Sequence, residues 1–228
     1  MCALFKCSRK GDIVISHSAN GDNELLQVAE PVVLSKKVKV TVPEGFNASV
    51  TVNNDEDHLC RLDPCVELKL LERLGKTYKG KQVKIVYYPK SASTIRAGWG
   101  IGGLHVRNDK LLQDYTVGAN GSFTVEIDNY KALLYAFPDK KSVMLDDVKG
   151  KISSSFNERA KKILADYFAN DNVSVFEINT YIQDFGEKLK EAMKYNEEFS
   201  KYGVKLDTVN VAGFYVPEDD IERIRNNE

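Results

Sequence analysis

The stretch that decides the fold is the last third of the chain, residues 142–228, which reads SVMLDDVKGKISSSFNERAKKILADYFANDNVSVFEINTYIQDFGEKLKEAMKYNEEFSKYGVKLDTVNVAGFYVPEDDIERIRNNE. It predicts two helices, one strand and the start of a third helix. The first helix is expected over 143–168, because apolar residues at helical spacing form one face there. These residues are Leu145, Val148, Ile152, Phe156, Ile163 and Tyr167.

The second helix opens with a start signal. Ser174-Val175-Phe176-Glu177 fits the capping-box pattern, in which the serine hydroxyl accepts a hydrogen bond from the third helical N–H. Gly203 stands where a left-handed residue ends a helix. The apolar stripe between them consists of Ile178, Ile182, Phe185, Leu189 and Met193. We interpret both stripes as core-packing faces, because self-association through them would need longer heptad repeats.

A strand and a new helix follow. Residues 204–211 alternate apolar and polar side chains, with one irregularity at Thr208. Pro217 suits the first turn of a helix, and the acidic residues Glu218, Asp219 and Asp220 suit its positive end. We expect 217–228 to be the start of a C-terminal helix that continues in a longer protein.

Strand patterns dominate the first 140 residues. Residues 38–42 and 48–52 alternate apolar and polar side chains, and Pro43–Asn47 joins them, so we expect a β-hairpin. Val83–Tyr88 is typical of a strand that Pro89 ends, and Asp128-Asn129 is placed to cap a short helix. Because strands come first and helices follow, the fold class is α+β with an antiparallel or mixed sheet.

Composition limits the functional classes. The 228 residues include 32 Lys and Arg against 33 Asp and Glu, a net charge of −1, so bulk attraction to nucleic acid or an anionic membrane is not indicated. No run of lysines forms a polybasic anchor. No apolar run is long enough for a transmembrane segment, and the N-terminus does not resemble a signal peptide. We expect a cytoplasmic protein, at most peripheral to the membrane.

The glycine-rich stretch Gly98–Gly103 matches G-x-G-x-x-G, a pattern of dinucleotide-binding loops. In such loops the glycines open a helix, whereas Leu104–Arg107 is expected to be a strand. We therefore interpret the stretch as a tight loop between strands, with Trp99 packed on the sheet.

Four cysteines form two C-x4-C pairs, Cys2 with Cys7 and Cys60 with Cys65, which is a weak zinc-binding pattern. Ordinary thiols are the preferred interpretation. His17, His58 and His105 lie far apart in sequence, although His105 could face the core. No motif of nucleophilic or acid–base catalysis is present in the sequence. We expect no enzymatic activity, no catalytic residues and no cofactor.

Several segments together resemble the stomatin/prohibitin/flotillin (SPFH, or band 7) family. The opening segment is Val42–Val50 followed by Asn53-Asn54, and the middle is Gly98–Gly100, Val106–Asp109 and Gly121–Asp128. The closing segment comprises Tyr202–Val204, the strand to Val211 and Val216–Glu218. Within the family, the resemblance is to the soluble bacterial branch labelled virion-core-protein-like.

The resemblance implies an α+β domain without enzymatic activity, whose C-terminal helix runs into a coiled coil. It implies oligomeric scaffolds that organise membrane patches or surround membrane proteases. We expect an extension over 1–37 and an SPFH-like domain over 38–224, strand-rich over 38–140 and helical over 141–224.

The expected function is a scaffold or protein-interaction module. Its expected partners are further copies, through sequence beyond Glu228, and a membrane-associated protein. Ile221 and Ile224, at helical spacing, are the candidate exposed contacts. The alternative is a peripheral lipid- or ligand-binding domain, and a zinc- or nucleotide-dependent enzyme is a third hypothesis.

Overall fold

A computed structural model describes residues 12–18, 23–52, 55–62, 67–110, 112–170 and 173–227, without the side chains of 55–62, 67, 68 and 227. The chain divides into two compact units. Unit 1 comprises Met1–Ser93 with Phe137–Leu145, and unit 2 comprises Thr94–Ala136 with Asp146–Glu228. The domain ranges expected from the sequence, 1–37 and 38–224, stay a prediction.

Unit 1 is built from two sheets. The smaller has the order β1-β4-β7, with β1 parallel to β4 and β7 antiparallel to it. The larger has the order β11-β2-β8-β5-β6, and β3 also pairs with β8. Its strands and short helices are β1 Ile13–Ser16, β2 Glu24–Val28, β3 Val32–Val33, β4 Val38–Thr41, β5 Phe46–Val52, β6 Asp55–Leu62, β7 Glu67–Lys69, α1 Leu70–Leu74, η1 Lys76–Tyr78, β8 Gln82–Pro89 and β11 Ser142–Met144.

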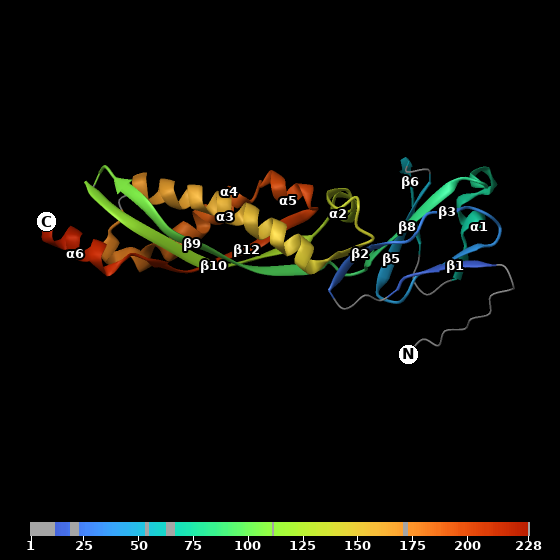
Figure 1. Ribbon diagram of the computed structural model, residues 1–228, viewed down its shortest axis with the longest axis horizontal. Helices are drawn as coiled ribbons and strands as arrows, with labels where there is room; N and C mark the ends of the chain where they lie inside the picture. Colours follow the sequence, from blue (N-terminus) through green and yellow to red (C-terminus); the bar gives the residue numbers. More distant parts are fainter. Residues whose placement is uncertain are drawn as a thin grey trace. The chain divides into compact units, whose positions relative to one another are not determined.

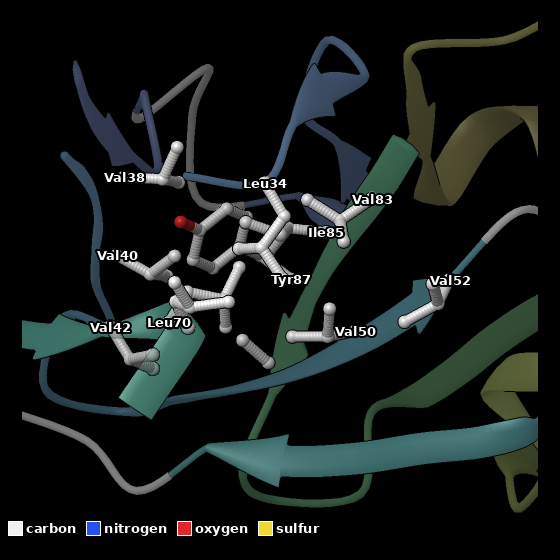
Figure 2. Close-up of a cluster of buried hydrophobic side chains, with 12 residues drawn as sticks. Leu34, Val38, Val40, Val42, Val50, Val52, Leu70, Val83, Ile85 and Tyr87 are labelled. Atoms are coloured by element: carbon white, nitrogen blue, oxygen red, sulfur yellow. The ribbon is translucent and has the colours of Figure 1, made fainter. Parts of the chain in front are cut away.

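The expected hairpin of residues 38–52 is wrong, because β4 and β5 belong to different sheets. The turn at Pro43–Gly45 carries the chain from one sheet to the other. Their apolar faces then pack against each other, and Figure 2 shows the valines of β4 and β5 converging with Ile85 and Tyr87. Alternation predicted the buried face correctly but does not specify the hydrogen-bonding partner.

Unit 2 is an antiparallel sheet of order β12-β10-β9 with helices on one face (Figure 1). The strands are β9 Thr94–Asn108, β10 Gln113–Ile127 and β12 Val204–Tyr215. The helices are α2 Tyr130–Ala136, α3 Leu145–Asn170, the 3₁₀ helix η2 Val175–Tyr181, α4 Ile182–Met193, α5 Glu197–Lys201 and α6 Glu218–Asn227. The antiparallel sheet and the helices that cover one of its faces confirm the α+β expectation.

Aromatic side chains fix α3 on the sheet. Phe156 of α3 stacks on Phe123 of β10, with ring centroids 4.2 Å apart and planes at 2°. The Trp99 ring of β9 also lies near Phe156, with ring centroids 5.7 Å apart. Further along α3, the Phe168 ring meets Tyr115 of β10 and Phe214 of β12. Because Phe123, Phe156 and Phe168 are each at most 1 % exposed, these contacts are the centre of the unit 2 core.

The helices of the last third confirm most of the local predictions. Asn129 Oδ1 accepts from the N–H groups of Lys131 and Ala132, which caps α2. Gly203 adopts φ +63°, the left-handed conformation expected of it. The capping-box expectation is wrong in detail: Ser174 Oγ accepts from Phe176 N–H rather than from the third helical N–H. The residues before α4 form the 3₁₀ turns of η2, and Glu177 within them has non-helical backbone angles.

The glycine-rich stretch 98–103 is not a tight loop, contrary to expectation. It lies inside the 15-residue strand β9, with a register shift opposite Gly118. Trp99 packs on the sheet as expected, and its Nε1 donates to the Asn210 carbonyl of β12 at 3.2 Å. To reach β12 the indole crosses β10 at Gly121, where a Cβ would lie 2.8 Å from Nε1. The absence of a side chain at Gly121 therefore makes the contact between β9 and β12 possible.

Candidate interaction surface

The last helix begins as its sequence predicts. Backbone N–H groups of Asp220 and Ile221 donate to the Pro217 carbonyl at 3.1 and 3.2 Å, forming the first turn of α6. The three acidic residues that follow Pro217 lie at the positive end of the helix, where carboxylates are favourable. The sequence thus places α6 directly after strand β12.

α6 protects an edge of the sheet. Strand β12 ends at Tyr215, opposite Gly118, so β10 has no β12 partner before that residue. There Asp220 Oδ2 accepts from the Thr116 N–H at 2.7 Å, and Arg223 donates to the Asp114 carbonyl. These contacts satisfy backbone groups that an edge strand otherwise presents to other chains.

The carboxylate of Asp220 also binds Arg223, through Oδ1 at 2.9 Å. The hydrogen bond from Arg223 is the main reason that the pKa of Asp220 lies below its ordinary value. The Thr116 N–H lowers this pKa further, whereas partial burial opposes the shift. The electrostatic environment therefore keeps Asp220 ionised while it holds α6 against β10.

The structure places the two isoleucines of α6 differently. Ile224 is 4 % exposed and packs inward, so the expectation that it is an exposed contact is wrong. Ile221 is partly exposed. The interaction role expected of the pair stays a prediction, and Ile221 is the member that a partner can reach.

Two aromatic residues that the sequence analysis missed lie around α6. Tyr215, just before α6, is 65 % exposed, and Phe176 of η2 is 42 % exposed. Arg225 of α6 lies over the Phe176 ring, with its guanidinium carbon 5.9 Å from the centroid. We name Phe176, Tyr215, Ile221 and Arg225 the α6 surface. A signal existed for Phe176, since it falls outside the buried stripe of the same segment.

On the opposite edge of the sheet, a side chain also binds one backbone group of the edge strand. Gly100 of the edge strand β9 donates its N–H to Asn157 Oδ1 of α3 at 3.1 Å. Side chains of the helices thus form hydrogen bonds with backbone groups of both β9 and β10. We infer that a partner contacts unit 2 through side-chain surfaces more readily than by adding a strand at these positions.

The expected zinc ligands lie outside what the structure describes: Cys2, Cys7 and Cys65 are outside the described residues, and the side chains of Cys60 and His58 are as well. Elsewhere in the described chain, no cluster of three or more His, Cys, Asp or Glu residues could hold a metal ion. The zinc site therefore stays a weak hypothesis. His105 does not face the core, because its side chain is 69 % exposed and contacts Asp114 at 2.7 Å.

A polar cluster in unit 1 contains a serine, a histidine and a glutamate. His17 Nε2 lies 2.7 Å from Glu24 Oε2, and the Ser142 hydroxyl donates to the other oxygen of Glu24. In a catalytic triad the histidine lies between the serine and the carboxylate and takes the serine proton. Here the carboxylate lies between the two. The cluster is thus arranged to tie β2 to β11 and to the end of β1, rather than to activate Ser142.

Within the described ranges, no helix has the length and hydropathy that crossing a bilayer requires. A search of curated proteins finds no match to the chain. The family model described as SPFH domain–Band 7 family matches residues 76–227, which is more than half of the chain. The chain therefore belongs to the SPFH domain–Band 7 family.

Proposed function

We propose that this protein is a non-enzymatic scaffold and protein-interaction module that associates with further copies of itself through the α6 surface. The observation that carries the proposal is the exposure of Tyr215 and Phe176 beside a helix that two hydrogen bonds to the backbone of β10 fix on the sheet. Membership of the SPFH family supports a scaffold role in general.

The chemistry of the α6 surface suits protein contacts. Tyrosine and arginine are enriched among the residues that contribute most to protein interfaces, because each combines a large contact area with hydrogen bonding. Ile221 adds an aliphatic contact on the same helix. Because Asp220 and Arg223 already hold α6 on the backbone of β10, association requires little further ordering of this helix.

The size of α6 limits the affinity. A stable interface usually buries at least about 1,200 Å² in total, which is more than one ten-residue helix supplies. We therefore expect weak, concentration-dependent self-association of these 228 residues. The proposal also includes a membrane-associated protein partner and a cytoplasmic location. Assignment to the virion-core-protein-like branch remains a prediction from the sequence.

Hydrogen exchange at two protein concentrations tests which surface is used. If the proposal holds, amides of α6 and of η2 gain protection in the concentrated sample. Amides around Tyr195, which is 73 % exposed at the end of α4, should exchange equally in both samples. Protection that increases elsewhere and not at α6 would overturn the choice of surface.

A further inference from the structure

Positive charge is concentrated in two segments of unit 1. Residues 31–41 contain three lysines, and residues 73–86 contain four lysines and one arginine, while neither segment contains Asp or Glu. The whole chain has a net charge of −1. Its near neutrality therefore conceals a local excess of positive charge.

Backbone hydrogen bonds bring the two segments together. The Leu34 N–H donates to the Lys81 carbonyl at 2.8 Å, and the Gly80 N–H donates to the Leu34 carbonyl at 2.9 Å. Strand β3 continues this contact, with Val33 opposite Gln82 of β8. The turn that carries Lys36 and Lys37 thus lies close to the turn at Lys79–Lys81.

Five exposed lysines of these turns form what we name the lysine surface: Lys36, Lys37, Lys76, Lys79 and Lys81. In the part of the chain that the structure describes, none of them forms an ion pair, and Lys81 lies over the Tyr78 ring at 5.1 Å. Nearby carboxylates bind other lysines: Asp12 pairs with Lys39, and Glu72 with Lys69. The repulsion among these five lysines is therefore reduced only by solvent or by a binding partner.

An apolar side chain accompanies the lysines. Val33 is 58 % exposed and lies within the β3 segment that bridges the two turns. Ile13, whose N–H donates to the Lys37 carbonyl, is 47 % exposed. Lysines with long flexible stems around exposed aliphatic groups suit the boundary between lipid headgroups and acyl chains.

The same features disfavour nucleic acid as the occupant. Arginine is the preferred residue for phosphate recognition in nucleic-acid interfaces, because its planar group binds two oxygens at once. Among the eight cationic residues of the two segments, only Arg73 is an arginine. Stacking platforms for single strands use exposed aromatic faces, whereas Tyr78 lies under Lys81.

We propose that the lysine surface docks unit 1 on a bilayer containing anionic phospholipid, with Val33 entering the headgroup region. Charge supplies most of the attraction, since each lysine close to an anionic membrane strengthens binding about fivefold. This inference is independent of self-association through α6, because it rests on other residues of another unit.

Vesicle co-sedimentation of the full chain tests the proposal. The two vesicle types are pure phosphatidylcholine and phosphatidylcholine with about one third phosphatidylserine, the anionic lipid expected to attract lysines. The test variant is Lys79→Gln/Lys81→Gln. Its control is Lys188→Gln/Lys194→Gln, which removes the same charge from α4 and its C-cap, where both lysines lie beside carboxylates. Circular dichroism confirms that both variants fold.

The proposal expects binding to the anionic vesicles only, weakened by high salt. The test variant should bind about 25-fold more weakly than the native chain, with the control nearly unchanged. Val33→Ser should weaken binding without changing its salt dependence. Equal binding to both vesicle types, or equal losses in test and control variants, would overturn the proposal. The native chain could instead bind a single-stranded oligonucleotide more tightly than the anionic vesicles, with the same loss in the test variant. That result would overturn the bilayer proposal and identify nucleic acid as the partner of the lysine surface.

Discussion

Asp220 of the last helix accepts a hydrogen bond from the backbone of Thr116 at 2.7 Å, at the point where β10 has lost its β12 neighbour. A side chain thereby takes the place of the missing strand. This contact fixes where α6 starts on unit 2, and with it the position of the residues that we propose for self-association.

Replacing Asp220 by Asn should loosen α6. The variant keeps an acceptor for Thr116 but loses the charge that binds Arg223, so we expect about 1 kcal/mol lower stability at neutral pH. Urea denaturation measures the loss. Asp219→Asn, in the same helical turn, is the control and should change stability by at most about 0.5 kcal/mol.

The same carboxylate predicts a pH dependence. Because folding lowers the pKa of Asp220, its contribution to stability is present above the ordinary carboxyl pKa of about 4. This contribution is lost as pH falls through the lower pKa of the folded state. The difference in urea midpoint between the native chain and Asp220→Asn should therefore shrink on acidification. A difference that grows in acid would contradict the arrangement.

Gly121→Ala should be strongly destabilising. A Cβ at this position would lie 2.0 Å from the Asn210 carbonyl oxygen and 2.8 Å from Trp99 Nε1, so the indole or the strand has to move. We expect a loss of about 3 kcal/mol. A Cβ at Gly102 of β9 meets nothing within 4 Å, and Gly102→Ala should cost at most about 0.5 kcal/mol. Similar losses in both variants would refute the role given to Gly121.

Phe156→Ala should remove the central contact between α3 and the sheet. The side chain is fully buried and stacks on Phe123, so we expect a loss of about 3–5 kcal/mol in the free energy of unfolding. Tyr195→Ala removes a comparable ring from the surface and should have little effect. Thermal or urea unfolding followed by circular dichroism separates the two.

Two buried tyrosines of unit 2 should respond oppositely to loss of the hydroxyl. Tyr115 Oη has no hydrogen-bond partner among the described residues, and burial raises the pKa of Tyr115 to about 12. Tyr115→Phe should therefore leave stability unchanged or raise it. The Tyr167 hydroxyl donates to Asp184 at 2.6 Å, and Tyr167→Phe should cost about 1 kcal/mol. A larger loss at Tyr115 would indicate an unrecognised partner.

The helical third of the fold was predictable because helical periodicity persists there over many turns. Stripes such as Val148, Ile152 and Phe156 mark the buried face of α3 directly. The strand through Gly98–Gly103 was not predictable, since consecutive glycines usually indicate a loop. Here a register shift, and a tryptophan that crosses a glycine on the next strand, keep the stretch inside the sheet.

The candidate surfaces were less accessible to sequence reasoning. Helical spacing indicated Ile221 and Ile224 together, but only the folded structure shows that Ile224 is buried. The lysine surface is formed by turns about 40 residues apart, which hydrogen bonds at Leu34 bring together. No local run of charge indicates such a surface, because its lysines are neighbours only after folding.

The central claim is self-association through the α6 surface, and light scattering of the full chain over a range of concentrations tests it most directly. The account predicts a mass that rises above that of one chain with concentration. It predicts that Tyr215→Ser/Ile221→Asp keeps the chain monomeric, whereas Tyr195→Ser associates like the native chain. A native chain that is monomeric at every concentration, or a Tyr215→Ser/Ile221→Asp variant that associates normally, would contradict the account.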